Sequence, residues 1–504
     1  MQEPSQTHRP APAPAKRPTG AGGKGASQDG SRNRVIVLGG GCCGLFAALR
    51  LAQQGKAVTV IEKEAIVGGL ARGTRRGANH YDLGVHMLHA FDQEVFETVR
   101  GVMGDESIDV ALDAKIKWAG RFFRYPLQFG ELIRGIPKWK LLRCSAGLLW
   151  YPLWRKLRNR PPANAEEALI DLYGKPLYEF FFKDFTTRYW GFPPDQLSAT
   201  FITTKMPRLS AVDVIKKLLP WLWSKDDAVE TALAEETLYY SRSGAEGMPR
   251  CMAAEIEKLG GQVLTRASVT AVHRSGDQVT GVSYREGDAE GPVQRLDCCQ
   301  LISTIPLPAF IHAMNGAVPK SILEAAGRLR YKPIAIYGLL VDKEQALNAL
   351  YVYYRKRCFH RVGEPKNAGM IVTPADHTVL IVETTCEIGG PKWSSDPEFV
   401  DRMIADLEAE GICTRDQIVE THVLQETHGY PIFELGFEEH LDVVRDYIAH
   451  LTNVCSAGRQ GDFCFPNMHG AMRMGADAAD RVLERMALAA GDRQDGTADA
   501  WNAD

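Results

Sequence analysis

The chain has 504 residues, of which 45% are hydrophobic and 24% are charged, and its formal net charge is -3. This length is enough for two or three domain-sized units, each with its own core, which excludes a wholly disordered chain. The lack of a basic excess argues against nucleic acid as a partner.

Neither end of the chain is expected to fold. Residues 1–33 are rich in Pro and Gly and lack the apolar core of a signal peptide, so we expect a disordered tail. The polar residues 489–504 are expected to form a second one. The 11 cysteines include no CxxC pair that would indicate zinc, and we interpret them as reduced thiols of a cytoplasmic protein without a metal site.

A βαβ unit is predicted directly after the first tail. Arg34–Leu38 is a short β-branched run, Leu45–Gln54 has helical spacing up to the stop at Gly55, and Ala57–Ile61 is a second apolar run. Two parallel strands joined by a helix are the unit of Rossmann-type sheets. The sequence therefore predicts an α/β fold.

The rest of the chain changes character more than once. Residues 95–239 are richer in aromatic residues and have a helical period, which predicts an inserted substrate domain. Alternating strands return in residues 331–430, and a helix is expected from about Met468 to Leu488. Further short strands are expected at Gln262–Thr265 and Val269–His273 as a pair, Val279–Tyr284, Leu301–Ile305 and Val454–Ala457.

These elements predict a discontinuous domain organisation. A dinucleotide-binding domain is assigned to residues 34–94, 240–310 and 440–488. A mixed helix-and-sheet substrate domain is assigned to residues 95–239 and 311–439.

Gly39, Gly41 and Gly44 have the spacing of a dinucleotide-binding turn. The first glycine permits the tight turn, the second lets the backbone approach a pyrophosphate, and the third lets the helix pack on the strand. Cys43 lies inside this turn as a small packing residue. Glu62 ends the second strand, where a carboxylate can accept hydrogen bonds from an adenosine ribose. The spacing alone does not distinguish NAD from FAD.

The block that follows, Glu62–Arg72, resembles the second FAD signature of the superfamily of amine oxidases, protoporphyrinogen oxidases and UDP-galactopyranose mutases. The resemblance implies FAD as the cofactor, in a two-dinucleotide fold with an inserted substrate domain. Arg72 is suited to phosphate. The candidate cofactor-binding residues of this block are Glu62, Lys63, Gly69, Leu70 and Arg72.

Further segments extend the resemblance over residues 34–485. Tyr81–His89 is similar to the G-x-H-x-x-H segment that runs past the flavin in the mutases, which implicates Gly84. Leu177–Gly191 is similar to an aromatic stretch shared by the mutases and the protoporphyrinogen-oxidase-like branch. Tyr240–Val269 is similar to a block of the oxidase branch, in which the backbone of Val269 meets the adenine.

A last flavin-contacting element is indicated near the carboxyl end. Gly458–His469 resembles the terminal element of the superfamily, although Asn467 stands where an aspartate is usual. The candidate cofactor-binding residues here are Gly458, Arg459, Asn467 and Met468.

Two residues are candidates for catalysis. His86 follows Gly84 closely, and His86 or His89 is expected near the isoalloxazine. Lys332 resembles the amine oxidase lysine that holds a water at the flavin, whereas its place before Pro333 also suits a solvated turn.

Three functions are compatible with these features. The first is an FAD-dependent oxidoreductase that takes hydride from a C–N or C–C bond of a small organic, isoprenoid or sugar-linked substrate. The second is a non-redox mutase-like isomerase that uses reduced flavin, and the third is a non-catalytic flavin-binding partner. The Tyr240–Val269 block and the chain length favour the oxidoreductase.

Residues 145–154 and 218–223 are candidates for peripheral membrane contact. Both mix aromatic with apolar residues and lie beside lysines or arginines, as membrane-interface segments do. Short apolar runs also suit a buried helix of the substrate domain. No run reaches the roughly 18 uninterrupted apolar residues that predict a membrane span.

Overall fold

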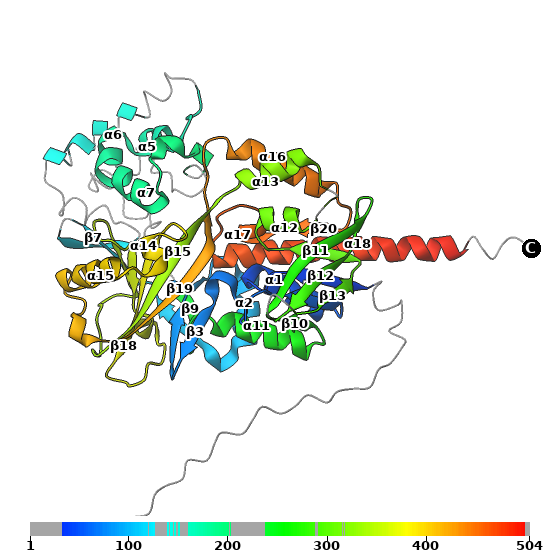
Figure 1. Ribbon diagram of the computed structural model, residues 1–504, viewed down its shortest axis with the longest axis horizontal. Coiled ribbons are helices and arrows are strands. Elements are labelled where there is room, and N and C mark those ends of the chain that lie inside the picture. The colour runs from blue at the N-terminus through cyan, green and yellow to red at the C-terminus, as the bar shows by residue number, and fades with distance from the viewer. Residues whose placement is uncertain are drawn as a thin grey trace, which may run out of the picture.

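A computed structural model describes most of the chain between residues 33 and 498 (Figure 1). The described residues are 33–118, 120–125, 139–140, 142–144, 146–147, 150–151, 160–200, 202, 237–287, 291–314, 316 and 318–498. The segment 218–223, one of the two candidates for membrane contact, lies outside them.

A five-stranded parallel sheet confirms the predicted α/β fold. The strands lie in the order β10-β2-β1-β14-β20, so the first βαβ unit supplies the centre and later segments supply the edges. The β-branched and leucine side chains of β1, β2, β14 and β20 are buried, because both faces of a parallel sheet are covered, whereas those of the edge strand β10 are partly exposed. The strands are β1 (Arg34–Leu38), β2 (Ala57–Ile61), β10 (Gln262–Leu264), β14 (Gln300–Ser303) and β20 (Val454–Ser456).

Helices cover one face of this sheet, and a small antiparallel sheet with three helices covers the other. The first layer contains α1 (Cys42–Gln53), α2 (Gln93–Met103), α11 (Gly247–Lys258) and α18 (Met468–Ala498). The second contains β11 (Ala267–Ser275), β12 (Gln278–Glu286), β13 (Val293–Asp297), α12 (Leu307–Ala313), α13 (Lys320–Arg328) and α16 (Phe437–Ala449).

Two expectations for these elements were wrong in detail. β10 and β11 do not pair, because β10 adds to the parallel sheet beside β2 while β11 turns away to pair with β12. The helix α18 continues to Ala498 instead of ending near Leu488. Its last part contains alanine, arginine and glutamine, which are good helix formers even where polarity suggests a frayed end.

A seven-stranded sheet forms the second half of the molecule, in the order β19-β15-β18-β17-β16-β7-β8. Its central strands are buried on both faces, with α15 (Pro397–Ala409) packed on one of them. The strands are β7 (Ala114–Trp118), β8 (Arg121–Tyr125), β15 (Tyr331–Val341), β16 (Tyr351–Tyr354), β17 (Arg361–Gly363), β18 (Thr378–Thr385) and β19 (Ile418–Pro431).

The helical period expected for residues 95–239 holds for the part of α2 that they contain but not for the strands that follow it. In Ala114–Trp118 buried apolar residues alternate with partly exposed lysines, a period of two that is too short to stand out in a segment of this length. The additional strands are β3 (Gly73–Arg76), β4 (Asn79–Asp82), β5 (Leu88–His89), β6 (Ser107–Ala111) and β9 (Thr237–Ser241). The helices that follow are α5 (Ala165–Tyr173), α6 (Lys175–Leu177), a π-helical turn at Tyr178–Phe182 and α7 (Lys183–Trp190).

No helix in the described ranges is both long and apolar enough to cross a bilayer. Within the same ranges, no group of three or more His, Cys, Asp and Glu side chains is placed to hold a metal ion.

Candidate functional site

A cavity of about 340 Å³ runs from the carboxyl ends of the parallel strands toward the seven-stranded sheet. In an open α/β sheet this edge is where ligands bind. The predicted residues on its wall are Gly39, Gly41, Cys43, Glu62, Lys63, Gly69, Leu70, Arg72, His86, Val269, Gly458, Arg459, Asn467 and Met468.

The glycine turn leaves no room for a side chain at Gly39 or Gly44, whereas a Cβ on Gly41 would make only an ordinary contact, 3.8 Å from the Cα of Gly69. Gly39 has a φ of 96°, and a Cβ there would lie 2.6 Å from Oγ1 of Thr304. Gly44 does not line the cavity, but a Cβ on it would overlap the carbonyl oxygen of Gly39, so it sets how closely α1 approaches the strand. Thr304 also donates a hydrogen bond to the carbonyl of Leu38, at 2.8 Å.

A glycine pair from the next motif, Gly68 and Gly69, packs against this turn. Gly41 and Gly68 form an isolated parallel bridge, and a Cβ on Gly69 would lie 3.1 Å from the Cα of Gly41. The two glycine motifs, far apart in the sequence, thus form one wall made of bare backbone. Such a wall suits close approach by a pyrophosphate.

Glu62 is held at one end of the cavity by backbone donors. The amides of Gly40 and Glu64 donate to its two carboxylate oxygens at 2.7 and 2.8 Å. Burial raises the pKa of Glu62, and these two hydrogen bonds oppose that rise. Its carbonyl accepts from the amide of Ala267, two residues before Val269, so β11 and the end of β2 meet at the cavity.

Arg72 lies on the cavity wall, and its side chain is bound by a residue of the seven-stranded sheet. Its guanidinium donates to the carboxylate of Glu426 on β19 and to the carbonyl of Gly69, both at 2.9 Å. Burial would raise the pKa of Glu426, but hydrogen bonds from His428 and the charge of Arg72 outweigh it, so the pKa is lowered. Arg72 therefore joins the two sheets beside the place where a phosphate was expected.

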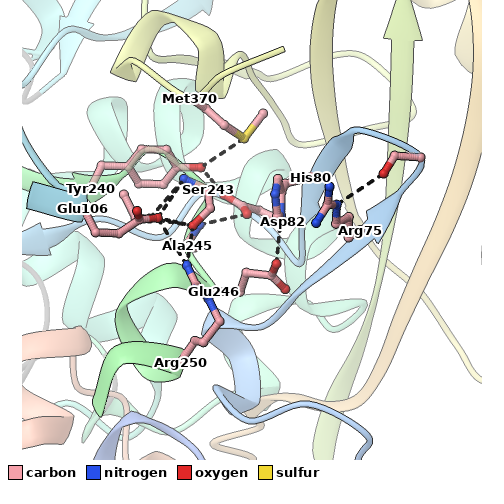
Figure 2. Close-up of polar contacts among 12 residues, drawn as sticks. Arg75, His80, Asp82, Glu106, Tyr240, Ser243, Ala245, Glu246, Arg250 and Met370 are labelled. Atoms are coloured by element: carbon pink, nitrogen blue, oxygen red, sulfur yellow. Dashed lines mark hydrogen bonds and ion pairs between the residues drawn. The ribbon is translucent and has the colours of Figure 1, made fainter. Parts of the chain in front are cut away.

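Asp82 anchors the segment that leads to His86. One of its carboxylate oxygens accepts from the amide of Ala245 at 2.9 Å, and the other accepts from the hydroxyl of Tyr240 (Figure 2). A Cβ on Gly244 would lie 2.6 Å from the same carboxylate. The loop before α11 and the strand before Gly84 are therefore fixed to each other.

Two neighbouring contacts strengthen the same junction. His80 and Glu246 lie 2.8 Å apart, and Arg250 reaches Glu106 at 3.3 Å, beside Ser243 (Figure 2). The block from Tyr240 onward, which resembles the oxidase branch in sequence, is thus a support for the cavity as well as a part of the sheet layer.

His86 lies on the wall with a neutral ring. Burial lowers the pKa of His86 to about 4, and the charges of Arg361 and Arg459 add to that effect. Its Nδ1 atom is buried and has no hydrogen-bond partner among the described residues. Gly84 does not line the cavity, but a Cβ there would lie 3.3 Å from Cε1 of His86. Gly84 therefore makes room for the ring.

The opposite end of the cavity carries positive charge. Arg459 lies 5.4 Å from the ring centroid of Tyr430 and 4.7 Å from that of Phe465, and it donates to the carbonyl of Pro466 at 2.8 Å. In the described part of the chain no carboxylate forms an ion pair with it. Burial lowers the pKa of Arg459. A guanidinium nevertheless keeps its charge in proteins. Met468 on the wall begins α18, whose amino end adds a partial positive charge.

Lys332, the second catalytic candidate, is not on the cavity wall. It lies in β15 with 3% exposure and forms an ion pair with Glu387. The alternative of a solvated turn residue is wrong, because the strand continues through Pro333 and buries the side chain.

The wall also has polar residues that were not singled out from the sequence, among them Thr304, Glu426, His428 and Gln460. Thr304 follows a strand that stops at a proline, a signal that could have identified it. Gln460 lies within the predicted flavin-contacting segment Gly458–His469, whereas Glu426 and His428 belong to no recognisable motif. The side-chain carbonyl oxygen of Gln460 is buried and has no partner among the described residues, so it can accept from a bound group.

The cavity fits a long dinucleotide with polar groups at both ends. It offers the bare glycine wall, the carboxylate of Glu62 at one end, and the unpartnered polar atoms of His86 and Gln460. The fold and the site therefore define a dinucleotide-binding protein of the two-sheet type.

The model of the flavin containing amine oxidoreductases matches residues 42–483, and the chain belongs to this family. Its cofactor is FAD.

Individual relatives are more distant. The chain is 25% identical over 177 residues to a probable UDP-galactopyranose mutase of Klebsiella pneumoniae, a match covering 34% of this chain and 44% of that protein. It is 23% identical over 340 residues to a phytoene dehydrogenase of Streptomyces griseus, covering 61% of this chain and 60% of that one. Both matches span less than two thirds of the relative.

Among solved structures, that of a reduced UDP-galactopyranose mutase is similar in fold. The TM-score is 0.73 at 18% identity, and the match covers 90% of this chain and 94% of the other. The shared fold thus extends well beyond the region where the sequences align.

Proposed function

We propose that the chain is an FAD-dependent oxidoreductase that takes hydride from a C–N or C–C bond of a small organic, isoprenoid or sugar-linked substrate. The observation that carries the proposal is the buried positive charge of Arg459 beside the amino end of α18. Buried fixed charge acts strongly because little water screens it. This wall favours a group that becomes negative during the reaction.

The cofactor, when bound, supplies the hydride-accepting chemistry, and the chain supplies placement and charge. Glu62 and the glycine wall fix one end of the dinucleotide. At the other end Arg459, Gln460 and Asn467 offer polar contacts. His86 is neutral at physiological pH, so its ring can accept a proton or a hydrogen bond from the substrate.

The extent of the sequence matches also supports an oxidoreductase. The match to the dehydrogenase runs through 340 residues, whereas the match to the mutase runs through 177.

A mutase is the second candidate, and the surroundings of His86 favour it. Arg361 donates to the carboxylate of Glu383 at 3.0 Å, and the hydroxyl of Tyr430 donates to the same carboxylate at 3.3 Å. Gly84 lies beside Glu383 as well as His86. This polar group is better suited to a sugar-like substrate than to a hydrocarbon.

Anaerobic absorbance spectra distinguish the two functions. We expect the oxidised protein to lose its flavin absorbance when mixed with an amine or a polyene substrate, and to recover it when an acceptor is added. Turnover of a nucleotide sugar by dithionite-reduced protein, with no change in flavin absorbance, would overturn the oxidoreductase in favour of the mutase.

A further inference from the structure

Large apolar side chains are exposed together at one end of the molecule. They come from two segments, the strand β8 and the helical residues between 139 and 151. The exposed fractions are 44% for Tyr125, 62% for Trp139, 73% for Leu142 and 62% for Trp150. Isolated exposed apolar residues are ordinary, but a group of four from adjoining segments indicates a contact surface.

Aromatic packing holds the two segments next to each other. Trp118 of β7 lies between them, with its ring centroid 5.8 Å from that of Phe123 on β8 and 4.4 Å from that of Phe180. Nζ of Lys140 lies 4.7 Å from the centroid of the same Phe180. β7 and α6 lie at the end of the molecule opposite the carboxyl terminus (Figure 1). The surface is therefore far from the parallel sheet.

Basic residues are interspersed with these side chains. Arg121 is exposed on β8 opposite Trp118, and Lys140 and Arg143 lie on the helical segment. Glu179, at the border, forms an ion pair with Lys175 at 3.9 Å. The chain as a whole has a net charge of -3, so this cationic surface, which we name the basic aromatic face, is a local feature.

We propose that the basic aromatic face binds the surface of an anionic lipid bilayer. Tryptophan, tyrosine and phenylalanine insert at the level of the lipid headgroups, while arginine and lysine bind their phosphates. Part of the predicted segment 145–154 takes part through Trp150.

Two other occupants suit the face less well. A symmetric dimer would bring the same cations of two copies together, and like charges repel. Nucleic acid would pair with Arg143 and Lys140 but would leave Leu142 without a matching contact.

Vesicle flotation of the full chain with bound FAD tests the proposal. We expect flotation with vesicles that contain phosphatidylglycerol, less with phosphatidylcholine alone, and a decrease at high salt. The double variant Trp139→Ser with Trp150→Ser should lower partitioning about tenfold or more. Lys140→Gln and Arg143→Gln should each lower it about 5-fold.

Matched control variants distinguish binding through this surface from non-specific adsorption to vesicles. Ile371→Ser with Ile388→Ser removes apolar residues of 61% and 62% exposure elsewhere and should leave flotation unchanged. The double variant Lys258→Gln with Lys320→Gln removes two positive charges elsewhere and should also leave flotation unchanged. Failure of the wild-type chain to float, equal losses in test and control variants, or self-association through the face without vesicle binding would each overturn the proposal.

Discussion

The two ends of the cavity are built in different ways. The end near Glu62 comes from one βαβ unit and the glycines that follow it, and its contacts are mostly backbone hydrogen bonds. The end near His86 and Arg459 joins segments that are hundreds of residues apart, through side chains of β19 and the start of α18. Local backbone geometry therefore fixes the end near Glu62, which we call the local end. Packing of the two sheets fixes the end near His86 and Arg459, which we call the assembled end.

The largest expected effect is at the local end. In Gly44→Ala the added Cβ overlaps the carbonyl of Gly39, and overpacking at this contact should cost about 3 kcal/mol or more. We expect FAD-free or insoluble protein, measured by flavin content and melting temperature. Gly101→Ala in α2, where nothing lies within 4 Å, should instead be neutral or stabilising. Normal FAD content in Gly44→Ala would contradict the close approach.

The second prediction concerns the pH dependence of two groups that flank Gly84. Burial raises the pKa of Asp82 from 3.8 to about 6, so its stabilising contribution is complete below 3.8 and is lost as the pH rises through 6. The pKa of His86 is lowered from 6.5 to about 4, so stability is lost as the pH falls from 6.5 toward 4. Each contribution amounts to at most about 3 kcal/mol.

The contributions of Asp82 and His86 to stability change in opposite directions with pH, and single variants should reveal this. Relative to wild type, Asp82→Asn should gain melting temperature as the pH rises from 4 to 6, whereas His86→Gln should gain it as the pH falls. The measurement is the difference in melting temperature from wild type at several pH values. Parallel profiles for both variants would show that the two pKa values are not displaced in opposite directions.

The third prediction returns to the local end. Glu62→Gln keeps the shape but removes the charge that strengthens hydrogen bonds to ribose hydroxyls, which contributes on the order of 1.5 to 3 kcal/mol. The dissociation constant of FAD should rise about tenfold or more by titration of the apoprotein. The neighbouring Glu64→Gln is the control, because it removes a negative charge from the same cavity wall. The carboxylate of Glu64 forms an ion pair with Lys63 at 3.4 Å. Equal effects in both would remove Glu62 from the ribose site.

The smallest expected effect tests the assembled end. Arg459→Met removes a buried cation while keeping an apolar side chain of similar length. The two-electron reduction potential of the bound flavin should become more negative by about 30 mV, which corresponds to about 1.4 kcal/mol. Arg445→Met, which removes an arginine near the exposed side of Asp462, is the control. An unchanged potential in Arg459→Met would mean that the charge is not directed at the flavin.

The sequence by itself determined the local end and the family. Gly39, Gly41 and Gly44 follow a strand and begin a helix, and Glu62 ends the next strand, so chain connectivity alone brings them together. The helical period predicted for residues 95–239 was wrong at β7, because an alternation of apolar residues and lysines over only five positions is lost in the composition of a long segment.

Only the tertiary structure decided the assembled end. Glu426 and His428 reach the cavity because β19 pairs along the full length of β15, and no local motif encodes that register. The same pairing places Lys332 inside β15, away from the cavity, although its sequence neighbourhood suggested the flavin. Long-range register depends on the sum of many side-chain contacts, so it cannot be read from the few residues that later form the site.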